Sequence, residues 1–293
     1  MEGKPCCTPA RAGTVAMPAP RPAPRVARID IEMIALPGGE FVMGSDAGEG
    51  LPADGEAPAR HVAVKPFRIG ATTVTNREFG DFVRATRYVT EAEQTGQSFV
   101  FHMQVPEALR ATIRQVPAGL PWWLVVDDAC WQRPEGPGSH VRDRPGHPAV
   151  HVSWHDARAF CEWAGMRLPT EAEWEFAARG GLDQKRYPWG DELRPNGDWR
   201  CNIFQGDFPH RPAQGWSPGT RDARAFAPNG FGLYNTSGNV WEWCEDWFAP
   251  GQRSMRGGSF LCHDSYCNRY RTSARQGLTP DSSTGNVGFR VCR

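Results

Sequence analysis

The sequence has no excess of charge of either sign. Its 33 Lys and Arg residues balance 33 Asp and Glu residues, so the formal net charge is zero at pH 7. Proteins that bind nucleic acids or anionic membranes usually present a strongly basic surface. The balance therefore argues against nucleic acids and membranes as partners.

Long apolar runs are missing as well. No stretch reaches the roughly 18 consecutive apolar residues of a membrane-spanning helix, and the N-terminus lacks the apolar segment of a secretory signal peptide. We therefore expect a cytoplasmic protein, in a compartment that keeps thiols reduced.

The cysteines lack the patterns of a structural framework. Nine is an odd number, so they cannot all be paired in disulfides, and there is neither a Cys-x-x-Cys pair nor a Cys/His spacing of the usual zinc type. Some thiols must therefore be unpaired, and a structural zinc site is not expected.

Glycine and proline are abundant, whereas helical periodicity is scarce. The 32 Gly and 26 Pro residues favour irregular backbone, while 40% hydrophobic residues suffice for a core. Residues 1–29 are rich in Pro, Ala and Arg and poor in large apolar side chains, which predicts a flexible tail. Residues 30–293 are expected to form one loop-rich α+β domain with few helices and short strands.

Local signals predict a few regular elements within that domain. Residues 31–45 and 61–70 are typical of strands, with an acidic loop between them and a turn signal at Pro37. Thr75, Ser153 and Thr170 each precede apolar residues at three- and four-residue steps, and so predict three helix starts.

Beyond residue 185 the sequence becomes rich in Trp, Gly, Asn and Asp, as in "PNGFGLYNTSGNVWEW". Glycine and asparagine interrupt each apolar run, so we expect little regular structure there. Bound Ca²⁺ would stabilise such loops, since it takes amide, carboxylate and backbone carbonyl oxygens.

Reactive side chains are concentrated in residues 256–275, "RGGSFLCHDSYCNRYRTSAR". Cys262 and Cys267 are five positions apart and share no face of a helix or strand, so a turn must bring them together. The pair would then form a disulfide, structural or redox-active, or a two-thiolate site for Cu(I). Arg269, Arg271, Arg275 and His263 would favour the thiolate form.

This stretch resembles the formylglycine-generating enzymes, also called sulfatase-modifying factors. The resemblance extends from about residue 30 to the C-terminus and includes "GGEFVMGS", "HPAVHVSWHDARAFCEWAGMRLPTEAEWEFAARGG", "NGFGLYNTSGNVWEW" and "GGSFLCHDSYCNRYR". It implies a single domain of the formylglycine-generating enzyme and C-type-lectin-like type, with calcium-stabilised loops. It also implies a copper oxidase that uses O₂ and an external reductant to convert the cysteine of a Cys-x-Pro-x-Arg motif in a sulfatase polypeptide to Cα-formylglycine.

The resemblance assigns roles to individual residues. Cys262 and Cys267 would bind Cu(I), and the substrate thiolate would join them. The residues expected around this centre are Ser259, Trp241, Tyr266 and His263. The second of two calcium sites would use Asn235, Gly238, Val240 and Glu242.

The first calcium site departs from the family pattern. It would use Asn202, the Ile203 carbonyl, Gln214 and Trp216, but relatives have an aspartate where this chain has Gln214. The missing negative charge predicts weak calcium binding at this site. Cys161 matches one member of a bridge found in relatives, whereas Cys292 lies one position away from its partner, so we do not assume that disulfide.

The expected tail contains the string Cys7-Thr8-Pro9-Ala10-Arg11, next to Cys6. It has the Cys-x-Pro-x-Arg form of the motif that the family oxidises, and this composition yields such a string by chance about 0.08 times per chain. One hypothesis is that the tail is a substrate or a competing occupant of the protein's own groove. The other is an incidental, solvated tail.

Other functional interpretations stay open at the level of sequence. Tryptophans in "WEWCEDW" would suit a sugar- or peptide-binding protein of the same fold, and the cysteine pair would suit a thiol-disulfide redox protein. Glu171, Glu173 and Glu175 are interpreted as structural, because acidic residues favour the first turns of a helix. A non-haem iron enzyme is disfavoured, because no H-x-x-x-H-x-E pattern occurs.

Overall fold

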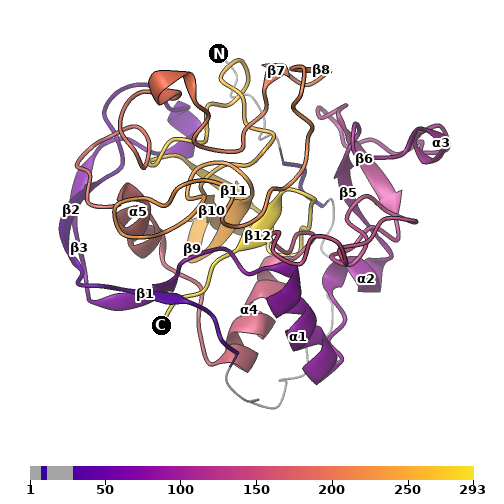
Figure 1. The fold of residues 1–293 in the computed structure, drawn as a ribbon, viewed down its shortest axis with the longest axis horizontal. Coiled ribbons are helices and arrows are strands. Elements are labelled where there is room, and N and C mark those ends of the chain that lie inside the picture. Colours follow the sequence, from indigo (N-terminus) through magenta and orange to yellow (C-terminus); the bar gives the residue numbers. More distant parts are fainter. Residues whose placement is uncertain (1–7, 12–28) are drawn as a thin grey trace.

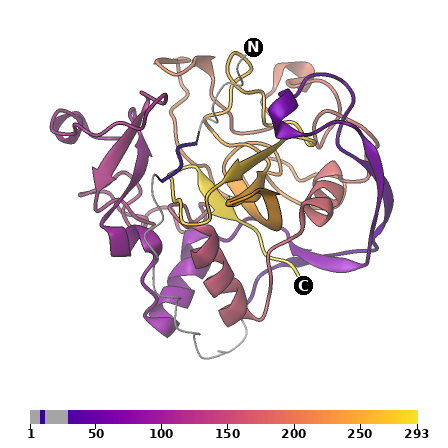
Figure 2. The same ribbon diagram turned by 180° about the vertical axis from the view of Figure 1, so that it is seen from behind.

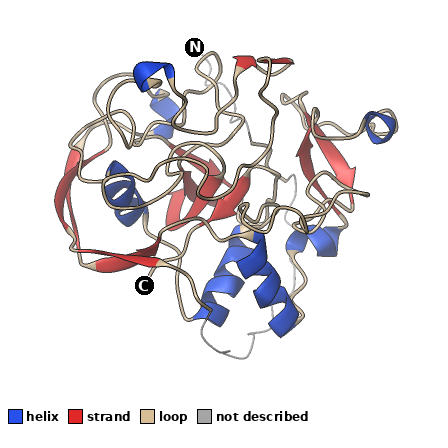
Figure 3. Cartoon of the chain, in the orientation of Figure 1, coloured by secondary structure: helices blue, strands red, loops and turns tan. Residues whose placement is uncertain are grey.

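The computed structural model describes residues 8–11 and 29–293. Short helices and strands are joined by long loops that surround a small central sheet (Figure 1; Figure 3). Cys6 and Cys7 lie outside the described residues, as does most of the expected tail.

The strands form one four-stranded sheet, ordered β11-β10-β9-β12, and four two-stranded sheets, β1-β4, β2-β3, β5-β6 and β7-β8. The strands are β1 (Met33–Leu36), β2 (Gly39–Met43), β3 (Arg60–Val64), β4 (Phe67–Gly70), β5 (Gln97–Phe101), β6 (Trp123–Asp127), β7 (Gly206–Asp207), β8 (Arg211–Pro212), β9 (Trp241–Ala249), β10 (Gln252–Arg256), β11 (Arg275–Leu278) and β12 (Val287–Phe289). The helices are α1 (Asn76–Thr86), α2 (Glu91–Thr95), α3 (Glu107–Arg110), α4 (Trp154–Ala164) and α5 (Glu171–Arg179), with short 3-10 helices at Pro52–Asp54 and Pro195–Gly197.

The three predicted helix starts are confirmed. Thr75, Ser153 and Thr170 are the N-caps of α1, α4 and α5, and each side chain accepts a hydrogen bond from the amide three residues later. Gly165 and Gly180 end α4 and α5 in the left-handed conformation. The predicted strand regions are also confirmed, as β1 to β4.

The expectation of little regular structure after residue 185 is wrong for β9, which is a central strand of the four-stranded sheet. Trp241 and Trp243 on this strand are fully buried, and the Trp243 indole donates to the Val152 carbonyl at 3.1 Å. These tryptophans are core residues, so they offer no exposed face for stacking on a sugar.

Buried ion pairs hold the irregular loops together. Arg290 is fully buried and pairs with Glu242 on β9 at 2.9 Å. Its guanidinium also donates to the carbonyls of Gly70, Ala71 and Tyr234 at 2.7–2.8 Å. One side chain therefore connects the end of β4 to the loop that contains Tyr234.

The arginines next to the cysteine pair are engaged in ion pairs. Arg269 pairs with Asp54 and Arg271 with Glu56, both at 2.6 Å, while Arg275 pairs with a glutamate of α5 at 2.5 Å. Asp54 and Glu56 belong to the acidic loop, which folds back onto this region. The three positive charges are thus matched by carboxylates, which weakens their expected support for cysteine thiolates.

The structural interpretation of the α5 glutamates is confirmed. Glu171 and Glu175 both pair with Arg256, which is fully buried on β10, and Glu175 also pairs with Arg179 at 2.6 Å. Glu173 completes the capping box of α5. In the described part of the chain, no helix has the length and apolar character needed to cross a bilayer.

The buried α5–β10 ion pairs predict a large effect of Arg256→Ala. Removing the guanidinium leaves the buried Glu175 carboxylate with only one of its two arginine partners, which should lower the free energy of unfolding by about 3 kcal/mol. Urea unfolding of the two proteins measures the difference. Arg211→Ala is the matched control, because Arg211 pairs with Asp207 on the surface, and its loss should cost less than about 1 kcal/mol. Equal losses in the two variants would contradict this role of Arg256.

Candidate functional site

The site is centred on the turn that follows β10. Gly257 and Gly258 have positive φ angles of 91° and 73°, so the sequence "RGGSF" can turn sharply here. A Cβ on Gly258 would lie 2.6 Å from the Arg269 carbonyl oxygen, which leaves no room for a side chain. Both glycines are therefore required to place Ser259 and Cys262.

Ser259 and Cys262 are joined by their own backbone. The Ser259 amide donates to the Cys262 sulfur at 3.4 Å, and the Cys262 amide donates to the Ser259 carbonyl at 2.9 Å. Both residues are fully buried. An amide that donates to a sulfur stabilises the thiolate relative to the thiol, so this turn favours a metal-binding sulfur.

A second turn separates Cys262 from Cys267. The His263 carbonyl accepts hydrogen bonds from the amides of Tyr266, Cys267 and Asn268 at 3.0, 3.0 and 3.2 Å. Cys262 and Cys267 belong to the same buried cluster and are 0% and 5% exposed. The chain therefore reverses between the cysteines, as their spacing requires.

The other expected site residues surround these turns. The His263 ring lies 2.8 Å from the Ser265 hydroxyl and so stabilises the second turn. The Tyr266 ring packs against Trp122 with ring centroids 5.1 Å apart. Trp241 is fully buried in the same cluster as the cysteines, and its indole N–H has no hydrogen-bond partner among the described residues.

Asn286 is a site residue that the sequence analysis missed. Its amide nitrogen donates to the Ser259 hydroxyl at 3.0 Å, and its amide oxygen accepts from the Thr284 hydroxyl at 2.6 Å. Its carbonyl accepts from the Trp241 amide at 2.9 Å. Asn286 thus fixes Ser259 relative to β9. Its only signal in the sequence is its place within the C-terminal part of the chain that resembles the family.

The loop that carries Asn286 is held by the β5–β6 hairpin and by His151. The His151 ring contacts the Ser98 hydroxyl at 2.8 Å and the Pro134 carbonyl at 2.9 Å, and its amide donates to the Thr284 carbonyl. Ser98 in turn donates to the Ser283 carbonyl at 2.7 Å. Burial lowers the pKa of His151 to about 4, so the ring is neutral at pH 7.

Comparison with known proteins assigns this fold to a family. The family model described as "Sulfatase-modifying factor enzyme 1-like domain" matches residues 18–293. The chain belongs to the formylglycine-generating enzyme family.

The relatives of this family member differ in the activity that their names state. The "Formylglycine-generating enzyme" of Streptomyces coelicolor is 54% identical, over 94% of this chain and 92% of the relative. The "Inactive C-alpha-formylglycine-generating enzyme 2" of Bos taurus is 48% identical, over 89% of this chain and 87% of the relative. PvdO from Pseudomonas aeruginosa, at 23% identity and a TM-score of 0.64 over 89% of this chain and 93% of that one, supports the α+β, loop-rich fold class.

For a metal at the cysteine turn, this family member offers two sulfur donors. The described residues bring together no group of three or more His, Cys, Asp and Glu that could hold a metal ion. Cys262 and Cys267 suit a soft ion of low coordination number, which needs only one further donor. The residues therefore fit Cu(I) with a ligand supplied from outside.

The second calcium site fits its ion in part. The buried Oδ1 of Asn235 has no hydrogen-bond partner among the described residues, as expected of an oxygen reserved for a cation. Gly238 and Val240, which follow Asn235 by three and five positions in the sequence, are also buried. The Glu242 carboxylate, however, accepts from Arg290 and from the Trp174 indole, so it is already engaged. Coordination by Asn235 and backbone carbonyls is what the structure offers.

The residues expected at the first calcium site fit a calcium ion less well than those of the second site. Asn202 and Ile203 are buried, and the Asn202 amide donates to the Gly219 carbonyl at 2.9 Å. Gln214 is exposed and Trp216 is partly buried. Without an acidic side chain, this set is a poor calcium site.

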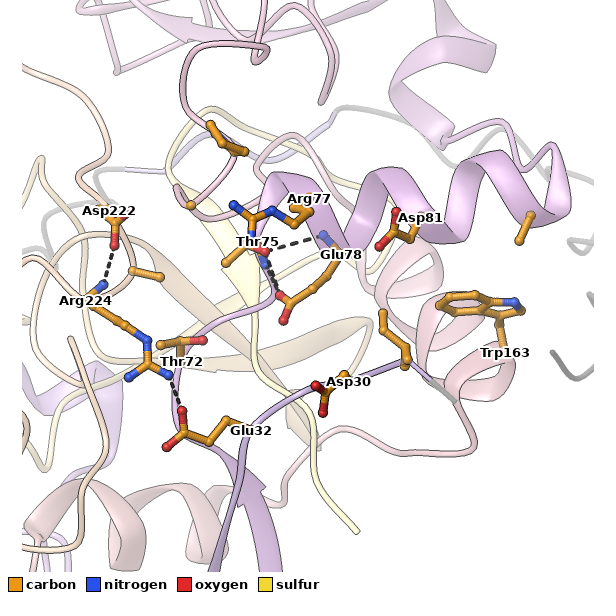
Figure 4. Close-up of a pocket in the computed structure, with 15 residues that line it drawn as sticks. Asp30, Glu32, Thr72, Thr75, Arg77, Glu78, Asp81, Trp163, Asp222 and Arg224 are labelled. Atoms are coloured by element: carbon orange, nitrogen blue, oxygen red, sulfur yellow. Dashed lines mark hydrogen bonds and ion pairs between the residues drawn. The ribbon is translucent and has the colours of Figure 1, made fainter. Parts of the chain in front are cut away.

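A separate cavity of about 970 Å³ lies beside α1 (Figure 4). Two of its acidic residues are engaged in local structure, since Glu78 caps α1 through Thr75 and Glu32 pairs with Arg224. None of the residues expected at the copper site line this cavity, so we do not regard it as the candidate active site.

The five cysteines outside the turn and the tail are buried thiols: Cys130, Cys161, Cys201, Cys244 and Cys292. Burial raises the pKa of Cys201 and of Cys292 to about 12, so these thiols stay protonated. Cys161 and Cys292 are not joined in a disulfide.

The neutral, buried His151 predicts a pH-dependent contribution to stability. Its folded pKa of about 4 lies below the ordinary value of 6.5, so the unfolded chain binds a proton first as the pH falls through this window. The stability advantage of wild type over His151→Gln should therefore shrink by about 2 kcal/mol between pH 7 and pH 5. Urea unfolding at both pH values measures it.

The comparison with His151→Gln isolates this residue from an opposing effect. Burial, with the nearby charge of Glu91, raises the pKa of Asp156 to about 7, which stabilises the fold as the pH falls. Both proteins share that contribution. A stability difference that stays constant with pH would show that His151 is not held neutral.

Proposed function

We propose that this protein oxidises the cysteine of a Cys-x-Pro-x-Arg segment in a sulfatase polypeptide to Cα-formylglycine. The observation that carries the proposal is the pair of buried turns that presents Cys262 and Cys267 in one cluster, in a chain that belongs to the formylglycine-generating enzyme family. The cysteine side chain reacts with O₂, two protons and two electrons from a thiol reductant. It becomes an aldehyde with release of hydrogen sulfide and water.

Cu(I) is the metal that we propose for Cys262 and Cys267. When bound, copper supplies the one-electron chemistry that lets O₂ react with a thiolate. The two protein sulfurs leave a position for the substrate thiolate, and their burial keeps water from that position.

The surrounding side chains orient the sulfurs and the substrate. The Ser259 amide fixes the Cys262 sulfur, and Asn286 fixes the Ser259 hydroxyl at 3.0 Å. Trp241 forms a rigid wall of the cluster. Such positioning reduces the entropy lost when the substrate carbon is brought to the oxidant.

A non-catalytic peptide binder is the second candidate. It is favoured by the named inactive relative, which is 48% identical to this chain and thus nearly as similar as the named enzyme. A thiol-disulfide redox protein is the third, because it also needs only two converging cysteines. Aldehyde formation distinguishes the first candidate from both others.

Cys262→Ser and Cys267→Ser should each abolish aldehyde formation on a Cys-x-Pro-x-Arg peptide and weaken Cu(I) binding. The physical reason is that a hydroxyl is a hard ligand, which Cu(I) binds poorly. Mass spectrometry of the peptide and competition with a Cu(I) chelator measure the two effects. Cys161→Ser is the matched control, because Cys161 is a buried thiol outside the turn.

Each other outcome of this experiment has a defined meaning. Aldehyde formation that survives in the double variant would overturn the proposal. Tight peptide binding without any mass change in the copper-loaded wild type would identify a binder. Peptide disulfides without aldehyde would identify a redox protein.

We propose one calcium ion at the Asn235 site. Because a ligand that binds only the folded state stabilises it, saturating calcium should raise the melting temperature by about 5 °C over chelator-treated protein. Asn235→Ala should lose this shift, whereas Gln214→Ala should keep it, since Gln214 is exposed. Absence of any calcium-dependent shift in wild type would contradict the site.

A further inference from the structure

Four residues of the expected tail lie against the candidate site. Thr8 and Pro9 are buried, Ala10 is exposed and Arg11 is half-buried. In Figure 2 this short indigo segment lies between the β5–β6 hairpin and the central sheet. These residues differ from a solvated tail, because they pack against the loop that carries Asn286.

Thr8 reaches the site through Asn286. The Asn286 side-chain amide donates to the Thr8 hydroxyl at 3.3 Å and to the Ser259 hydroxyl at 3.0 Å. One buried amide group therefore links Thr8 to the serine whose own amide donates to the Cys262 sulfur. Thr8 is only 4% exposed, so it lies within the site rather than over its rim.

Arg11 is bound at the other end of the segment. Its amide donates to the Ser282 hydroxyl at 2.8 Å, and its guanidinium donates to the Thr95 hydroxyl at 2.8 Å and the Gln97 carbonyl at 3.5 Å. Ser282 belongs to the same loop as Asn286, and Thr95 ends α2. The loop and the α2–β5 junction thus hold both ends of the segment.

The pattern of burial matches the motif that we propose for the substrate. Pro9 and Arg11, at its fixed positions, are buried or hydrogen-bonded, and Ala10, at one variable position, is exposed, while Thr8, at the other variable position, is buried through its contact with Asn286. Extended peptides are commonly recognised in this way, by a few anchored side chains along a groove. Cys7 directly precedes Thr8 in the sequence and lies outside the described residues.

We infer that residues 8–11 occupy the protein's own substrate groove and compete there with the substrate polypeptide. This inference rests on the proposed function for the identity of the groove, and on the contacts of Thr8 and Arg11 for its occupancy. The segment blocks the approach to Asn286 and Ser259, which are fully buried while Thr8 is in place.

The covalent connection makes the competition effective. Residues 12–28 connect the segment covalently to the domain, and such a connection gives an effective concentration on the order of 1 mM. If the segment fills the groove about four-fifths of the time, it raises the apparent Kd of an external peptide about fivefold. A substrate must therefore displace the segment, or bind while the segment is dissociated from the groove.

The decisive experiment measures binding rather than turnover. A fluorescent peptide with the sequence of residues 5–13 is titrated with reduced, metal-free protein under anaerobic conditions, and its anisotropy gives Kd. Deleting residues 1–11 should lower Kd about fivefold relative to the full chain. An equal Kd for both proteins, or no binding to either, would overturn the inference.

Point variants test the described contacts. Thr8→Val removes the hydroxyl that Asn286 contacts, and Arg11→Ala removes the guanidinium, so both should lower Kd as the deletion does. Cys7→Ser leaves both contacts and should behave like wild type in this metal-free assay. Arg21→Ala is the matched control for lost charge, because Arg21 lies in the same tail outside the segment. A change in the control as large as in Arg11→Ala would attribute the effect to charge alone and contradict groove occupancy.

The assay also separates this inference from the proposed function. If the deletion tightens peptide binding but the copper-loaded protein forms no aldehyde, occupancy stands and the oxidase proposal fails. If aldehyde forms at the same KM with and without residues 1–11, the oxidase proposal stands and occupancy fails.

Discussion

The buried pair of Arg290 and Glu242 is the interaction on which the site most depends. Glu242 lies on β9 and Arg290 directly follows β12, so the pair joins the two strands that are hydrogen-bonded in parallel. Arg290 also donates to three backbone carbonyls from two distant parts of the chain, Gly70 and Ala71 in one and Tyr234 in the other. Since Trp241 begins β9 and Asn286 immediately precedes β12, the pair fixes their separation. A loop-rich chain needs such contacts because helices and strands satisfy so little of its backbone.

The local features of the fold could be predicted because their causes are local. Thr75, Ser153 and Thr170 cap helices through an amide only three residues later, and the left-handed Gly165 ends one. Strand β9 could not be predicted in the same way. It is stabilised by pairing with β10 and β12, and Trp241 and Trp243 look like surface aromatics until the sheet buries them.

In the candidate site too, features with local causes could be predicted from the sequence and features with long-range causes could not. The turn between Cys262 and Cys267 follows from their spacing alone, but the contribution of Asn286 depends on a loop brought in by the fold. The ion pairs of the arginines beside the cysteines could not be predicted for the same reason. Arg269 and Arg271 each pair with a carboxylate 215 residues earlier in the chain. The residues next to these arginines in the sequence give no sign of such a partner. Long-range ion pairs of this kind decide which nearby charges remain available for chemistry.

The exposure of Ala10 has a consequence for recognition. A residue that faces solvent between two anchored neighbours contributes little to affinity, so a large or charged side chain at that point is tolerated as well as a methyl group. In the inferred groove, substrate polypeptides of otherwise unrelated sequence would then bind alike, provided that they keep the proline and the arginine. Selectivity would reside in a few anchor points rather than in the full length of the peptide.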